Sequence, residues 1–241
     1  QYTLTIAWGC STAYGTIDSH GHLVIANTVA SIGDSAFYQC LALKSVSFQA
    51  NSALSTIGYD AFAKSGLTTF EVPSSVTRID SYAFFSTSAL RSVNFEAGSA
   101  LKSISAQTFR YSGLTSIQLP DSINSVGLQA FGYCSDLALV IFDSPSALTN
   151  VGNSAFDHAG SSVSGGMTVV IQSNKQSMVT ESIDFPASAT VTDQSEYYTS
   201  CSIINNCDDC LSGQTINGNI CYWNPFSNKC GSFEGSGFGR S

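Results

Sequence analysis

The sequence predicts a β-rich solenoid in which short repeats stack their strands into one parallel ladder. Three features of the chain support this prediction. A phenylalanine recurs at intervals that alternate between 25 and 22 residues: Phe37, Phe62, Phe84, Phe109, Phe131 and Phe156. An Ile or Val lies five residues before each of them, and an apolar pattern with strand spacing follows the first five. Such a period is typical of solenoids, in which each unit buries its apolar face against its neighbours.

Composition restricts the class of protein further. The chain has 241 residues, 43% of them hydrophobic and only 11% charged, with a formal net charge of −8. The nine basic residues are scattered, which argues against nucleic acid as a partner, because phosphates require clusters of Lys and Arg. No apolar run reaches the ~18 residues that a membrane span needs. The chain starts at Gln1 without a leader pattern, so we expect a mature form or a fragment.

Residues 1–22 are predicted to form an N-terminal cap. Tyr2, Leu4, Ile6 and Trp8 alternate with Thr3, Thr5 and Ala7, which is the period of a strand with one buried face. A terminal repeat must shield the open end of the core, so we expect Trp8 to cover that end.

Residues 23–162 are predicted to form the repeats. After each of the first five phenylalanines comes a pattern of the form Leu-x-x-Val-x-Phe, as in Leu43, Val46 and Phe48, whose last two members lie on one face of a strand. The motif Ile57-Gly-Tyr-Asp-Ala-Phe62 and its copies lie on the return path, where Ala beside Phe suits a tight turn or a short 3₁₀ segment. Burial of each Phe stabilises the stack by roughly 1.5–3 kcal/mol.

The alternation of long and short repeats defines a true unit of 47 residues. The long repeat carries the connection Asn51-Ser-Ala-Leu54, and the short repeat carries Pro73-Ser-Ser-Val76. We therefore expect longer loops at every second turn along one edge of the solenoid.

These motifs resemble the BspA-type leucine-rich repeat, which is also seen in treponemal surface proteins. The likeness covers residues 20–160 in six copies and rests on Leu-x-x-Val-x-Phe, Pro-x-Ser-Val-x-x-Ile and Ile-Gly-x-x-Ala-Phe. The resemblance implies a curved parallel-sheet solenoid, extracellular or attached to a surface, that binds proteins or matrix. It implies no catalytic activity.

Residues 163–200 depart from the repeat and are predicted to be a C-terminal cap that grades into a linker. Met167-Thr-Val-Val-Ile-Gln172 predicts a final strand that pairs with the last turn. The Ser-, Thr- and Asp-rich segment from Ser173 to Ser200 follows it.

Residues 201–241 form a separate cysteine-rich unit with a Gly- and Ser-rich tail. Five of the eight cysteines lie in it, which favours an oxidising compartment: Cys201, Cys207, Cys210, Cys221 and Cys230. Zinc is the alternative, because Cys207 and Cys210 have ligand spacing, but no second Cys-x-x-Cys follows, which favours disulfides.

This unit resembles part of the plexin–semaphorin–integrin (PSI) module, with Asn224 where that module has a further cysteine. The resemblance implies that Cys201 pairs with Cys221 and Cys210 with Cys230.

The other candidate sites are few. Cys40 and Cys134 occupy equivalent positions four turns apart, too far for a disulfide, so each is expected to be a small buried residue, although Cys40 is also a candidate partner of Cys10. The three histidines and the recurring aspartates do not form a metal motif, and no set of acid, base and nucleophile can be assembled. We expect no cofactor, no metal and no enzyme.

The outward face of the strands is the candidate contact surface. Glu71, Asn94 and Gln118 should point outward from three of the strands, and Leu139 and Ile141 from a fourth, which is apolar. Exposed apolar residues on such a face mark a partner contact. The alternative is that the C-terminal cap folds over them.

The leading hypothesis is a non-enzymatic, extracellular structural or adhesive protein. It would contact copies of itself or other surface proteins, as in a surface assembly or filament, and its Ser and Thr content permits O-glycans. The alternative is a receptor-type ectodomain that binds a protein or glycan ligand on the strand face.

Overall fold

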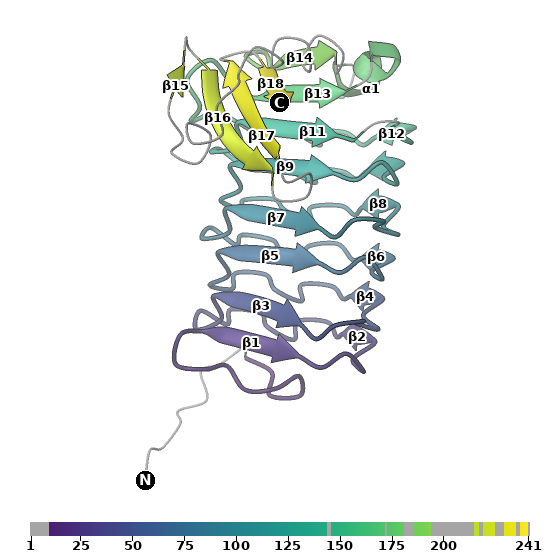
Figure 1. Ribbon diagram of the computed structural model, residues 1–241, viewed down its shortest axis with the longest axis vertical. Coiled ribbons are helices and arrows are strands. Elements are labelled where there is room, and N and C mark those ends of the chain that lie inside the picture. The colour runs from purple at the N-terminus through teal and green to yellow at the C-terminus, as the bar shows by residue number, and fades with distance from the viewer. Residues whose placement is uncertain are drawn as a thin grey trace.

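The structure is a computed structural model that describes residues 10–143, 146–171, 173–180, 186–193, 215–216, 219–224, 229–234 and 237–240. Within these residues, four-residue strands alternate with two-residue strands and stack along the long axis of the molecule (Figure 1). The strand predicted around Tyr2 to Trp8 lies outside the described residues.

The four-residue strands form the predicted parallel ladder. They are β1 (His22–Ile25), β3 (Ser45–Phe48), β5 (Thr69–Val72), β7 (Ser92–Phe95), β9 (Ser116–Leu119), β11 (Leu139–Phe142), β13 (Thr168–Ile171) and β14 (Thr190–Asp193). One sheet runs from β5 through β14, and β1 pairs with β3. The predicted final strand is β13, which pairs in parallel with β11. The predicted end of the repeats at residue 162 therefore precedes two further strands of the same sheet.

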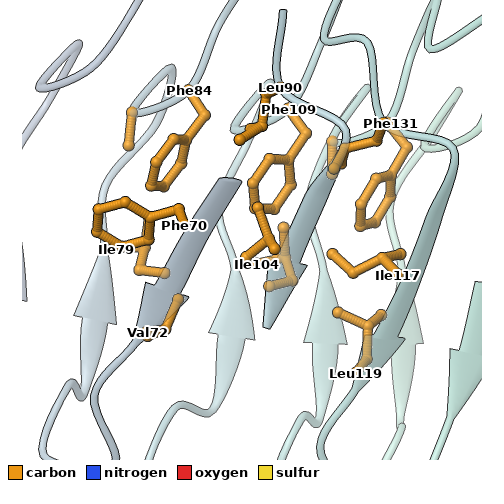
Figure 2. Close-up of a cluster of buried hydrophobic side chains, with 14 of the residues drawn as sticks. Phe70, Val72, Ile79, Phe84, Leu90, Ile104, Phe109, Ile117, Leu119 and Phe131 are labelled. Carbon is orange, nitrogen blue, oxygen red and sulfur yellow. The ribbon is translucent and has the colours of Figure 1, made fainter. Parts of the chain in front are cut away.

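The core of the solenoid is a continuous column of phenylalanine rings. All six recurring phenylalanines are fully buried. Neighbouring rings lie 5.2–5.5 Å apart and are stacked within 15° of parallel. Figure 2 shows Phe84, Phe109 and Phe131 at equivalent places in three successive turns. Each turn buries the same ring against the same neighbours, so the prediction of identical stacked units is confirmed.

The return path consists of short strands followed by turns. The short strands are β2 (Ser31–Ile32), β4 (Thr56–Ile57), β6 (Arg78–Ile79), β8 (Ser103–Ile104), β10 (Ser125–Val126) and β12 (Asn150–Val151). The turns after them hold the column phenylalanines, so the path has turns rather than the 3₁₀ segments that were the other expectation. We call this side of the solenoid the turn edge.

Backbone hydrogen bonds between neighbouring turns hold the turn edge together. The amide of Phe37 donates to the carbonyl of Ala61 at 2.7 Å, and the amide of Phe131 donates to that of Ala155 at 2.8 Å. The residues two before and two after each column phenylalanine have positive φ, and none of the twelve is glycine: Ser35, Gln39, Asp60, Lys64, Tyr82, Ser86, Gln107, Tyr111, Gln129, Tyr133, Ser154 and His158. Each such residue costs about 1–2 kcal/mol, which the repeated hydrogen bonds and the buried rings offset.

Three glycines recur with the unit of 47 residues. Gly66, Gly113 and Gly160 each donate a backbone hydrogen bond to the preceding turn, to the carbonyls of Cys40, Thr87 and Cys134 in that order. A Cβ atom on Gly66 or Gly113 would collide with the carbonyl of Leu41 or Ser88 in the longer repeat before it, and a Cβ atom on Gly160 would collide with Met167 and the carbonyl of Leu137. The long repeat therefore requires a glycine in the short repeat that follows it.

Many hydroxyl groups bind the backbone of the preceding turn. Ser75 Oγ donates to the carbonyl of Leu54 at 2.7 Å. The equivalent Ser122 Oγ donates to that of Leu101 at 2.6 Å. The Ser and Thr content of the repeats thus has a structural use, because the hydroxyls satisfy carbonyls that stacking leaves exposed.

The last described segments lie beyond the repeats. A 3₁₀ turn, η1 (Ser173–Lys175), and a short helix, α1 (Gln176–Thr180), connect toward β14. Lys175 Nζ donates to the carbonyl of Leu148 at 2.7 Å. Four antiparallel strands follow in sequence: β15 (Thr215–Ile216), β16 (Asn219–Asn224), β17 (Lys229–Glu234) and β18 (Gly237–Arg240).

Candidate functional site

The strand face carries the residues that the sequence nominates as partner contacts. Glu71 is exposed on β5, and Asn94 lies beside it on β7 in the parallel register. Gln118 on β9 is partly buried, and its amide donates to Asp143 Oδ1 at 2.5 Å. The three side chains point outward as expected, but the neighbouring outward positions on these strands hold only Ser and Thr.

The prediction that Leu139 and Ile141 lie open on this face is wrong. Their side chains are 2% and 4% exposed, and the residues beside them on β13, Thr168 and Val170, are buried too. Strand β11 is buried along both faces, so this end of the strand face is not available to a partner. Its burial agrees with the alternative that part of the chain folds over these residues.

The turn edge carries a second surface, a continuous row of aromatic rings. We call it the aromatic row, and its members are Tyr59, Tyr82, Phe85, Tyr111, Tyr133 and His158. Each ring contacts the next, with centroid separations from 4.5 to 5.7 Å. Tyr59 and Tyr111 are 46% and 41% exposed, so the row is open to solvent along its length.

The stacking order of the turns positions the row. Tyr111, Tyr133 and His158 each lie two residues after a column phenylalanine, at a positive-φ position that points the side chain outward. Tyr133 stacks on Tyr111 at 4.9 Å and on His158 at 4.5 Å. Because these contacts lie on neighbouring turns, both faces of the Tyr133 ring are covered and its edge faces outward.

One arginine completes the row. The guanidinium carbon of Arg110 lies 4.9 Å from the ring centroid of Tyr111 and 5.3 Å from that of Tyr133. Its Nη1 donates to Gln107 Oε1 at 3.0 Å, which fixes its orientation. Cation–π contacts of this kind contribute about 0.5–1 kcal/mol at exposed sites.

The surroundings of Tyr59 favour its neutral phenol. Desolvation raises the pKa of Tyr59, and the nearby Asp60 carboxylate raises it further. Burial likewise raises the pKa of Asp60, although Lys64 partly opposes this shift. Tyr59 therefore presents a hydroxyl group at its end of the row.

The cysteines divide into three groups. Cys10 and Cys40 form a disulfide with their Cα atoms 4.9 Å apart. Cys134 is a buried thiol whose Sγ donates to the carbonyl of Phe109 at 3.0 Å, and burial raises its pKa to about 12. The predicted pairs Cys201–Cys221 and Cys210–Cys230 lie outside the described side chains, so they stay predictions.

The described ranges hold neither a group of metal ligands nor a helix that could span a membrane. Among those residues, no three His, Cys, Asp or Glu side chains are grouped closely enough to hold a metal ion. Within the same ranges, no helix has the length and apolar character needed to cross a bilayer.

The aromatic row was not predicted from the sequence, although a signal for it is present. Tyr111, Tyr133 and His158 follow the column phenylalanines at one fixed offset in three consecutive repeats. The pattern is absent from the strand positions, because the row lies on the turns.

Comparison with known protein families gives one match. The model described as "BspA type Leucine rich repeat region" matches residues 11–138 and 102–224, in six copies. A comparison with curated protein sequences finds no match.

Three solved structures show similarity at low identity. The pneumococcal vaccine antigen PcpA is 20% identical with a TM-score of 0.46, over 58% of this chain and 48% of that one. A leucine rich cell surface protein from Faecalibacterium prausnitzii is 20% identical with a TM-score of 0.39, over 71% and 56%. The T. pallidum leucine rich repeat protein is 21% identical with a TM-score of 0.40, over 63% and 58%. The chain thus matches about half of the length of each of these three proteins.

Proposed function

Because this chain belongs to the BspA-type leucine-rich repeat family, we propose that it is a non-enzymatic binding protein of the cell surface or extracellular space. Its aromatic row is the surface that contacts a partner, and the partner is another protein. The row carries this proposal because it is an exposed, continuous set of aromatic side chains on an otherwise Ser- and Thr-rich molecule.

The composition of the row supports a protein partner. The centres of protein interfaces are enriched in Tyr, Phe and Arg and depleted in Ser, Asp and Glu. Truncations that weaken binding most are concentrated at Trp, Tyr and Arg. Tyr59, Tyr111 and Arg110 are of this kind, whereas the open strand face offers mainly Ser and Thr with a single carboxylate, Glu71.

The geometry of the row favours a protein over a glycan. Sugars pack flat against the exposed face of an aromatic ring, but both faces of Tyr133 are occupied by Tyr111 and His158. What remains accessible at Tyr133 is its ring edge and its phenol hydroxyl, beside Arg110. These groups suit the polar and aromatic side chains of a protein surface.

Two observations support a role without catalysis. The thiol of Cys134 is buried and its pKa is raised to about 12, so it is a poor nucleophile. Many of the hydroxyls bind a backbone carbonyl of a neighbouring turn, as Ser75 and Ser122 do. The disulfide between Cys10 and Cys40 supports the location outside the cell.

The test compares two double variants of the full chain. Tyr59→Ser with Tyr111→Ser removes the exposed rings of the row, and Thr69→Ala with Glu71→Gln changes the open strand face. We expect the first variant to weaken binding to the isolated surface coat of the producing cells at least tenfold, and the second to leave it unchanged. Sedimentation of the pure chain over a range of concentrations shows whether the partner is a second copy.

The opposite result would favour the other binding mode. If the strand-face variant loses binding while the row variant retains it, the ligand lies on the strand face and the receptor-type alternative is correct. Equal unfolding midpoints for both variants and the wild type must accompany either result.

A further inference from the structure

The aromatic row contains two pairs of tyrosines that lie across neighbouring turns. Tyr59 and Tyr82 have ring centroids 5.3 Å apart, with their planes at 52°. Tyr111 and Tyr133 have centroids 4.9 Å apart, with their planes at 30°. Partners in each pair are more than 20 residues apart in sequence, and only the stacking of the turns brings them together.

Phe85 separates the two pairs. Its ring lies 5.5 Å from Tyr82 and 5.7 Å from Tyr111, and it has no hydroxyl. A reaction that needs two phenols in contact can therefore join Tyr59 to Tyr82 and Tyr111 to Tyr133. It cannot join Tyr82 to Tyr111, because Phe85 lies between them.

One member of each pair is accessible to a dissolved oxidant. Tyr59 is 46% exposed and Tyr111 is 41% exposed. Among the cysteines whose side chains the structure describes, the free thiol that could compete for a tyrosyl radical is that of Cys134, which is fully buried and hydrogen-bonded to the carbonyl of Phe109.

We propose that the pairs Tyr59–Tyr82 and Tyr111–Tyr133 are sites of oxidative tyrosine coupling, with hydrogen peroxide as oxidant and a haem peroxidase as catalyst. Each phenol loses one electron and its hydroxyl proton, and the two phenoxyl radicals join through a carbon–carbon bond between ring positions ortho to the oxygens. The hydrogens on those two carbons then move to the oxygens and restore both phenols. One peroxide is reduced to two waters for each bond formed, so hydrogens and electrons balance.

The consequence is a covalent tie between neighbouring turns on the turn edge. The rings of each pair are already in contact, with centroids 5.3 Å and 4.9 Å apart, so coupling needs only a local rotation that brings two ortho carbons together. Each link closes a loop of one repeat and opposes separation of the turns. The proposal rests on the proposed function in one respect. A location at the cell surface or outside the cell would expose the chain to hydrogen peroxide and a secreted peroxidase.

The test uses the dilute, full-length chain with a haem peroxidase and a limiting amount of hydrogen peroxide. Dityrosine fluorescence measures the yield, and mass spectrometry of proteolytic fragments locates the bonds. We expect a monomer that has lost two hydrogens per bond, with linked fragments that join residue 59 to 82 and residue 111 to 133.

Single variants assign the bonds. Tyr59→Phe should abolish the first link and Tyr111→Phe the second, each lowering the fluorescence about twofold, and the double variant should lose nearly all of it. Tyr38→Phe is the matched control, since it removes a tyrosine outside both pairs and should keep both links. The same reaction on the chain unfolded in denaturant should link tyrosines without preference for these pairs.

Two results would overturn the proposal: links that mainly join other tyrosines or separate chains, or an unchanged yield in the Tyr59→Phe and Tyr111→Phe double variant. Neither result bears on the proposed function, because the coupling assay contains no binding partner and the binding assay contains no oxidant.

Discussion

The ring of Tyr14 lies 5.6 Å from the ring of Phe37 and extends the phenylalanine column by one aromatic ring at its N-terminal end. The hydroxyl of Tyr14 also accepts a hydrogen bond from the amide of Gly33 at 2.7 Å. Tyr14 is thus a described residue that does what the sequence assigns to Trp8: it covers the open end of the core.

Removal of this cover should destabilise the whole solenoid. Tyr14→Ala would expose one face of Phe37, and we expect the free energy of unfolding to fall by about 2–4 kcal/mol, as for large aromatic truncations. Tyr14→Phe should cost only about 0.5–1.5 kcal/mol, because it loses the hydrogen bond and keeps the ring. Urea unfolding measures both. Equal losses in the two variants would show that the hydrogen bond, not the ring, protects the end.

The disulfide between Cys10 and Cys40 should stabilise the same end. It closes a loop with a sequence separation of 30 residues, for which restriction of the unfolded chain predicts about 3–4 kcal/mol. We expect Cys10→Ser to lose that amount in urea unfolding. A reducing agent should remove the difference between the wild type and the variant, because any disulfides at the C-terminal cysteines are present in both. A wild type that keeps its stability under reduction would contradict this.

The glycines of the short repeats should not tolerate a methyl group. In Gly113→Ala the new Cβ would collide with the carbonyl of Ser88 and the guanidinium of Arg91. Relief of that overlap requires a shift of the backbone, for which we expect a loss of about 1–3 kcal/mol. Gly132→Ala is the matched control, since its Cβ would make only ordinary contacts from 3.4 Å outward. Similar unfolding midpoints for the two variants would show that the longer repeat adapts freely.

These residues show which parts of the fold are visible in the sequence. The phenylalanine column could be predicted because each turn needs a large apolar side chain at the same point, and this need repeats with the period of the chain. The close approach at Gly66 and Gly113 could not be predicted, since it depends on the path of an inserted residue in the preceding turn. The alternation of long and short loops could be predicted from the sequence. The glycines that make room for the long loops could not.

The candidate contact surfaces were harder to predict from the sequence than the fold. Leu139 and Ile141 alternate with the core-facing residues of their strand, as exposed residues do. This alternation alone does not reveal that other atoms cover them. The aromatic row was missed for a different reason. Its members belong to several offsets around the column phenylalanines, and only the stacking of the turns brings Tyr82, Phe85 and Tyr111 into contact.

The buried thiol of Cys134 should make stability depend on alkaline pH. Burial raises its pKa from 9.0 to about 12, because the folded core disfavours the thiolate. Between these two values the unfolded chain gives up the thiol proton while the folded chain keeps it. The unfolded state then binds fewer protons, so stability is fully present below about pH 9 and falls as pH rises toward 12.

Cys134→Ser isolates this effect, because tyrosines and lysines titrate in the same range in both proteins. We expect the free energy of unfolding of the wild type to fall with pH faster than that of the variant, by up to about 1.4 kcal/mol per pH unit above pH 9. Urea unfolding at several alkaline pH values measures the difference. Parallel pH profiles would mean that the thiolate is tolerated in the folded core, and a thiol reagent should then label Cys134 without prior unfolding.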